Sequence, residues 1–263
     1  MYRLRQASVW FDLLGMRMRC AGSRAVGGRK VSHEEMALKI FNNKYICIFC
    51  DERKSAETSH IASGNIGICR ECYDKLGKTA LSIPYPGTRD ISYIMSPFEY
   101  TGSMRQAILD FKFKGNIAYA PLFAGMSEEY LNSYPIWDSF DYIIPVPLHI
   151  SRLKERGYNQ SELIASHISD FIGVPMRTDI LQRIRATQKQ SGLKRHDRIL
   201  NVRDAFKCDT DLHGKSVIIF DDICTTGSTL QSCAAELKKS GAGAVCALTL
   251  AIYASEKIPL ITY

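Results

Sequence analysis

The sequence lacks any hydrophobic run long enough to cross a membrane as a helix. Its longest apolar stretches, such as Val245 to Ala254, fall far short of the roughly 20 residues that a membrane helix needs. A convincing secretion signal is also missing, because Asp12 interrupts the only apolar candidate, Val9 to Met16. We therefore expect no integral membrane segment and a cytoplasmic location, with association with the inner face of the membrane left open.

The body of the chain also lacks an excess of one charge sign. The whole sequence of 263 residues has a formal net charge of +7, but residues 1–31 carry seven Lys or Arg and one Asp. Residues 32–263 carry 27 basic and 26 acidic residues, so the overall charge does not predict a polyanionic partner. We expect residues 1–35 to be a disordered basic leader or a misassigned start before Met36. A basic amphipathic or targeting segment is the open alternative.

Nine cysteines are present, and four of them form two C-x-x-C pairs. Cys47 and Cys50 are separated from Cys69 and Cys72 by 18 residues, the spacing of a four-thiolate zinc ribbon or knuckle. Two such turns can complete a tetrahedron with Zn–S distances of about 2.3 Å, and a closed four-cysteine site makes the metal structural rather than catalytic. The sequence therefore predicts a small zinc module over residues 36–80. His33 and His60 are open as substitute ligands, although we expect both to be solvated loop residues.

A short buried strand followed by acidic and small residues is the most informative pattern. Val217 to Phe220 is a continuous apolar run, Asp221 and Asp222 follow it, and helical spacing begins at about Thr229. Backbone N–H groups at the start of a helix attract phosphate, and two carboxylates can accept hydrogen bonds from vicinal sugar hydroxyls. The pattern therefore predicts a ribose 5-phosphate site, with an ordinary strand-turn-helix as the alternative. Cys224 lies in the same stretch. We expect it to be a small buried hydrophobe, with a thiol activated by the helix N-terminus as the minor alternative.

This stretch resembles the phosphoribosyl pyrophosphate (PRPP) motif of type I phosphoribosyltransferases. Further motifs are Phe111-Lys112-Phe113-Lys114-Gly115-Asn116, Asp141 to His149, Arg156-Gly157-Tyr158-Asn159-Gln160 and Gln190 to Leu193. Together with the cysteine pairs, their order resembles the ComF family of competence proteins, over essentially all of residues 45–252. The resemblance implies an α/β fold for residues 81–263, a phosphoribosyltransferase-like parallel sheet flanked by helices, beside the N-terminal zinc module.

The resemblance also implies roles for individual residues. Asp221 and Asp222 would hold the ribose hydroxyls, and Thr225, Thr226, Gly227, Ser228 and Thr229 would hold the 5-phosphate. Pro145, Val146 and Pro147 would adjoin the pyrophosphate, with Arg156, Gln190 and Arg198 as further pyrophosphate or flap candidates. Mg²⁺ would be bound mainly through the oxygens of the phosphosugar. Each of these residues also has a plain structural alternative as a surface or scaffold residue.

Two functions are compatible with these motifs. The first is a PRPP-binding protein that assists uptake of single-stranded DNA in competence, with a competence helicase as partner. Basic residues between Arg183 and Arg203, with Lys112 and Lys114, would supply positive charge, and Phe113 and Tyr158 would supply stacking. The alternative is an active phosphoribosyltransferase of unknown acceptor. Amidophosphoribosyltransferase activity is not expected, because the chain has no glutaminase domain with an N-terminal cysteine nucleophile.

Overall fold

The computed structural model describes residues 44–79, 83–84, 90–134, 136–186, 202 and 204–253. The predicted leader over residues 1–35 lies outside these ranges, as do the flap candidates Gln190 and Arg198. No helix within the described ranges is both long enough and apolar enough to span a membrane.

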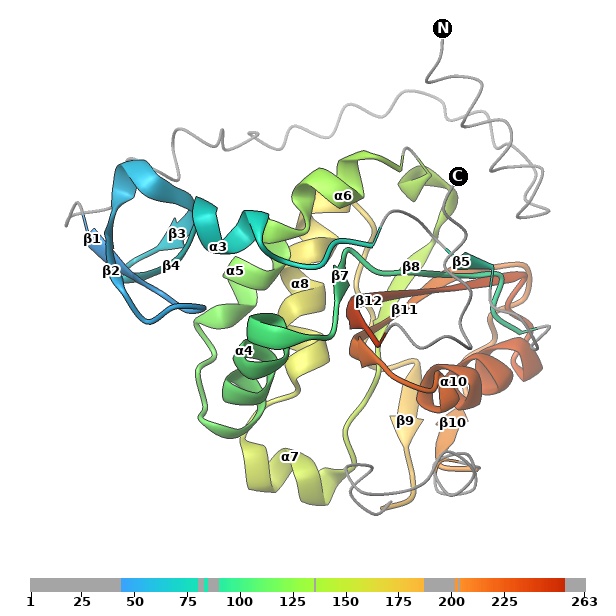
Figure 1. Ribbon diagram of the computed structural model, residues 1–263. Coiled ribbons are helices and arrows are strands. Elements are labelled where there is room, and N and C mark those ends of the chain that lie inside the picture. Colours follow the sequence, from blue (N-terminus) through green and yellow to red (C-terminus); the bar gives the residue numbers. More distant parts are fainter. Residues whose placement is uncertain are drawn as a thin grey trace, which may run out of the picture.

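A six-stranded sheet carries the core of the molecule (Figure 1). Its strands are β5 (Ile83–Pro84), β6 (Tyr93–Met95), β7 (Phe98–Glu99), β8 (Tyr142–Pro145), β11 (Ser216–Cys224) and β12 (Ala244–Ile252). The order is β5-β6-β12-β11-β8, and β7 pairs with the far end of β12. All neighbours are parallel except β5, which runs antiparallel to β6. The predicted parallel sheet is therefore confirmed.

Helices cover both faces of this sheet. They are α4 (Gly102–Phe113), α5 (Tyr119–Met126), α6 (Glu128–Asn132), α7 (Ile150–Arg156), α8 (Gln160–Ile172) and α10 (Ser228–Lys239). Ile218 and Phe220 of β11 pack into the apolar layer formed with α4, α5 and α8, while Val217 and Ile219 pack into the layer formed with α10. Because successive residues of a strand point to opposite faces, a continuous apolar run suits a strand covered on both sides.

The cysteine-containing segment forms a separate small sheet with the order β2-β1-β4-β3. Its elements are β1 (Lys44–Cys47), β2 (Arg53–Ser55), η1 (Ala56–Thr58), β3 (Ser59–Ser63), β4 (Ile66–Cys69) and α3 (Arg70–Asp74). The polar segment between the two cysteine pairs is thus largely regular structure. Tyr73 of α3 and the following Leu76 are buried in the larger core. The hydroxyl of Tyr73 donates to Met126 O at 3.3 Å, which ties α3 to the end of α5.

A short hairpin and a 3-10 turn complete the described structure. They are β9 (Leu181–Arg183), β10 (Phe206–Cys208) and η2 (Trp137–Ser139). β9 and β10 pair antiparallel, and the undescribed residues 187–201 lie between them in the sequence.

Two expected boundaries differ from the structure. β11 continues through Asp221 and Asp222 to Cys224 instead of ending before the acidic pair, because Asp221, Ile223 and Cys224 all remain in register with β12. The backbone of the acidic pair is therefore fixed by strand pairing with β12 and does not belong to a loop. α10 begins at Ser228, one residue earlier than expected.

Candidate functional site

A pocket of about 500 Å³ lies where β8 and β11 end. All seven residues of the predicted phosphosugar motif line it: Asp221, Asp222, Thr225, Thr226, Gly227, Ser228 and Thr229. The carboxyl ends of parallel strands, next to helix N-termini, are where open α/β sheets bind ligands. The fold therefore brings the motif together in one cavity.

The two carboxylates of the acidic pair have different surroundings. Asp221 retains some exposure to the pocket, and its Oδ1 accepts hydrogen bonds from Ser161 Oγ at 2.8 Å and from the Asp222 N–H at 2.9 Å. Asp222 is only 2% exposed. Ser161 lies in the first turn of α8, so this helix holds the orientation of the Asp221 carboxyl.

Burial raises the pKa of Asp221 to about 7, and the neighbouring carboxylate of Asp222 adds to the increase. Lys112 and the hydrogen bond from Ser161 act in the opposite direction. The Asp221 carboxyl therefore titrates near neutral pH in the ligand-free protein. A bound cation or sugar hydroxyl at this oxygen would favour its ionised form.

Lys112 is a site residue whose contact the sequence did not predict. Its Nζ lies 2.7 Å from Asp222 Oδ2, with both side chains largely buried. From the sequence, Lys112 could be either a solvated surface residue or one of the positive charges that contact DNA. The only signal in the sequence was its place in the Phe111 to Asn116 motif, which does not show that α4 lies beside β11.

The loop before α10 suits a phosphate group. Gly227 has a φ of +72°, a left-handed conformation that favours glycine, and it precedes the helix without a side chain that could cap it. Thr226 Oγ1 and Ser228 Oγ lie 2.9 Å apart at the start of the helix. The Ser228 N–H donates to Thr226 Oγ1 at 3.5 Å. N–H groups and hydroxyl donors around a helix N-terminus are a typical anion site.

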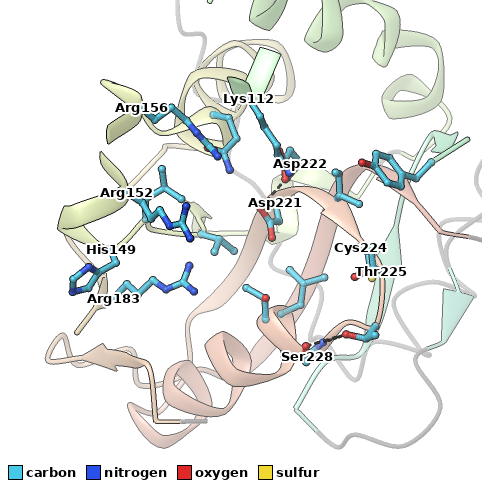
Figure 2. Close-up of a pocket in the computed structure, with 18 of the residues that line it drawn as sticks. Lys112, His149, Arg152, Arg156, Arg183, Asp221, Asp222, Cys224, Thr225 and Ser228 are labelled. Atoms are coloured by element: carbon cyan, nitrogen blue, oxygen red, sulfur yellow. Dashed lines mark hydrogen bonds and ion pairs between the residues drawn. The ribbon is translucent and has the colours of Figure 1, made fainter. Parts of the chain in front are cut away.

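Arginine side chains form the wall that faces this loop. Figure 2 shows Arg152, Arg156 and Arg183 on the side of Asp221 opposite to Thr225. Burial lowers the pKa of Arg183, and the nearby charge of Arg152 contributes to this decrease. An anion between these guanidinium groups would relieve their mutual repulsion.

The other predicted candidates are only partly gathered at the pocket. Val146 and Arg156 line it, whereas Pro145 and Pro147 are not among the lining residues. The motif around Arg156 has a structural basis, since Gly157 ends α7 with a φ of +84° and Asn159 caps α8. Arg156 also donates to Gln160 Oε1.

The four cysteines of the paired motifs come together in the small sheet. The sulfur atoms of Cys47, Cys50, Cys69 and Cys72 all lie within 4.8 Å of one another, close enough to hold one metal ion. The N–H of Cys69 also donates to Cys47 Sγ at 3.5 Å. A cluster of thiolates is the donor set that zinc prefers in structural sites.

The expectation for His60 is wrong, whereas Cys224 is a small buried core residue as expected, and only its minor alternative as an activated thiol is contradicted. His60 is a half-buried residue of β3 whose ring stacks on Tyr73 with centroids 3.5 Å apart, so it is neither a solvated loop residue nor part of the cysteine cluster. His33 lies outside the described residues. Burial raises the pKa of Cys224 to about 12, the opposite of an activated thiol.

No family model matches the chain, but curated proteins are similar to it. Competence protein F of Haemophilus influenzae is 37% identical over 38% of this chain and 44% of its own length. DNA utilization protein YhgH of Escherichia coli K12 is 36% identical over 40% of this chain and 46% of its own length. The chain thus spans less than half the length of these two relatives. Competence protein ComFC of Bacillus subtilis is 26% identical over 79% of this chain and 95% of its own length.

Among solved structures, a purine phosphoribosyltransferase from Pyrococcus horikoshii matches 52% of this chain and 73% of its own. The sequence identity is 22% and the TM-score is 0.29. The curated relatives do confirm the family resemblance predicted from the sequence. The chain is similar to competence proteins of the ComF type.

Proposed function

We propose that this is a phosphoribosyltransferase-like protein that binds PRPP, or a related phosphosugar, together with Mg²⁺. The observation that carries the proposal is the juxtaposition of Asp221 with the Thr225–Thr229 loop in a pocket walled by arginines. The ligand must carry both hydroxyls and phosphates, because an acidic pair alone would repel an anion. A phosphorylated sugar bearing a pyrophosphate meets both requirements.

In this proposal each part of the pocket takes one part of the ligand. Asp221 accepts hydrogen bonds from ribose hydroxyls, and the loop and the start of α10 take the 5-phosphate. Arg152, Arg156 and Arg183 face the pyrophosphate from the opposite wall. The carboxylate oxygens of the pair suit a hard cation, and Mg²⁺ would screen the phosphate charges, with its remaining ligands from the phosphosugar.

Calorimetric titration with PRPP and Mg²⁺ tests this assignment. The double variant Asp221→Asn/Asp222→Asn should bind at least about tenfold more weakly, since it loses the charged acceptors for the hydroxyls. Asp138→Asn changes an exposed carboxylate outside the pocket and should bind like the wild type. Release of pyrophosphate with a nucleobase acceptor would favour an active transferase over a binding protein.

We further propose that the rim of the pocket contacts single-stranded DNA, in keeping with the competence and DNA-utilisation names of the relatives. Phe113 is 67% exposed at the rim, and the Arg156 guanidinium lies 5.4 Å from its ring centroid. An exposed aromatic beside a cation is the arrangement that stacks unpaired bases. Tyr158 is less suited, because its hydroxyl donates to Phe111 O. A competence helicase remains the proposed protein partner.

Fluorescence anisotropy with a labelled single strand tests the DNA proposal. Phe113→Ala should weaken binding by about 5-fold or more, because a stacked base contributes roughly 1–3 kcal/mol. Phe171→Ala removes a 39% exposed ring of α8 that does not line the pocket and serves as the control. Equal affinities for both variants and the wild type would exclude the rim as the contact.

For the small sheet we propose a structural Zn²⁺ bound by Cys47, Cys50, Cys69 and Cys72. The support is the gathering of four sulfur atoms within 4.8 Å in a sheet with a very small core of its own. Such a fold gains much of its stability from the metal.

A further inference from the structure

Lys112 reaches the acidic pair from the last turn of α4. Its Nζ lies 2.7 Å from Asp222 Oδ2, and the two side chains are 17% and 4% exposed (Figure 2). Met104, Ile108 and Phe111 of α4 are buried in the core, so the helix that carries the lysine is firmly anchored. The ion pair is therefore a fixed part of the site rather than a surface contact.

The neighbouring lysine of the same motif behaves differently. Lys114 is 64% exposed and pairs with Asp110, one helical turn earlier, at 2.9 Å. It does not line the pocket. The motif therefore supplies one site lysine and one surface lysine, which gives a matched pair for experiments.

The position of Lys112 determines what else can approach Asp222. Asp222 is buried and the adjacent Asp221 faces the pocket. An uncompensated pair of this kind would attract a divalent cation, because carboxylate oxygens are preferred ligands of Mg²⁺. An ammonium group at hydrogen-bonding distance already neutralises one of the two charges. It also repels any second cation brought to the same oxygen.

We propose that Lys112 is the resident counter-cation of the acidic pair and keeps divalent cations from binding there without the phosphosugar. Mg²⁺ then enters the pocket only together with the phosphate oxygens of that ligand. The identity of the ligand rests on the proposed function. The metal-binding behaviour of the protein alone does not, so it can be measured separately.

The test is a titration of the whole chain with Mn²⁺, with the cysteine cluster saturated beforehand with Zn²⁺ and in the absence of any phosphosugar. Free Mn²⁺ is followed by its electron paramagnetic resonance signal. Lys112→Met should bind one Mn²⁺ per chain at least about tenfold more tightly than the wild type, because it leaves a buried carboxylate uncompensated. Lys112→Arg, which keeps the charge, and Lys114→Met should behave like the wild type. Lys112→Met/Asp222→Asn should lose the gained site.

The inference is overturned if the wild type and Lys112→Met bind Mn²⁺ equally well, or if the added Asp222→Asn change does not remove the gained site. If Lys112→Met does not fold, the single variant Asp222→Asn is compared with the wild type instead. We expect the two proteins to bind Mn²⁺ equally, because Lys112 already keeps the cation from Asp222 in the wild type. Weaker Mn²⁺ binding by Asp222→Asn would contradict the inference. A wild type that binds no PRPP in calorimetry would refute the proposed function and leave the Mn²⁺ result unaffected.

Discussion

The Asp221 carboxyl is largely shielded from water, but it still faces the pocket, where a ligand can reach it. Its oxygen is held by Ser161 and by the backbone of Asp222, but these hydrogen bonds do not compensate the loss of water and the nearby charge. Ionising Asp221 therefore has a cost in the ligand-free protein. A ligand that places hydroxyls or a cation at this oxygen offsets that cost.

This cost predicts a pH-dependent stability. The pKa of Asp221 is raised to about 7 in the folded protein, so between roughly pH 4 and 7 the native state binds more protons than the unfolded state, and stability falls as the pH rises. Asp221→Asn removes this dependence. The free energy of unfolding of Asp221→Asn, minus that of the wild type, should therefore increase by about 1–3 kcal/mol from pH 5 to pH 8.

Urea unfolding of both proteins at several pH values measures this difference. Any loss of the proposed zinc at low pH would affect both proteins and cancel in the comparison. Asp138→Asn, at an exposed position outside the pocket, is the control variant in the same measurement. A stability difference between Asp221→Asn and the wild type that stays constant across the range would contradict the raised pKa.

Asn159, between α7 and α8, positions Ser161, whose hydroxyl donates to Asp221. Asn159 is 8% exposed; its side chain accepts from the Ser161 N–H at 3.1 Å and donates to Val146 O at 3.1 Å. It thus caps α8 and ties the helix to the strand that borders the pocket. Ser161 then meets Asp221.

Removing this cap should destabilise the fold. We expect Asn159→Ala to cost about 2 kcal/mol, through the lost cap and the unpaired Val146 carbonyl. Asn159→Ser should recover part of this loss, because serine also caps helices. Asn132→Ala, at an exposed position on α6, is the control in the same denaturation experiment. A cost below about 0.5 kcal/mol would mean that the junction does not depend on this residue.

Some features of these elements could be predicted from the sequence, and others could not. The apolar run of β11 and the helical spacing that begins at about Thr229 in α10 are local patterns, and each leads to the correct kind of element. The extension of β11 through the acids depends on pairing with β12, and the contact of Lys112 with Asp222 joins residues far apart in the chain. Such contacts follow from tertiary packing, which one sequence does not specify.

The cysteine module, residues 44–74, is packed against the larger core of the molecule. Tyr73 follows directly after Cys72, its ring meets Phe98 at a centroid distance of 6.1 Å, and its hydroxyl reaches Met126 O. Loss of order around the cysteines should therefore weaken the packing of α5, which itself packs against α8.

Removal of the proposed zinc tests this dependence. Cys47→Ser/Cys69→Ser should lose about one zinc per chain and at least about 3 kcal/mol of stability, because metal binding contributes to folding directly. Metal analysis and thermal unfolding measure both effects. Cys208→Ser alters a half-buried cysteine outside the cluster and should retain the metal. Unchanged metal content in the double variant would exclude the cluster as the metal site.

Calorimetric titration of the wild type with PRPP and Mg²⁺ tests whether a phosphosugar binds at the acidic pair. We predict one site per chain, weaker binding of ribose 5-phosphate because it cannot engage the arginine wall, and loss of binding in Asp221→Asn/Asp222→Asn but not in Asp138→Asn. No binding by the wild type, or equal binding by the wild type and the acidic-pair variant, would contradict a phosphosugar site at the acidic pair.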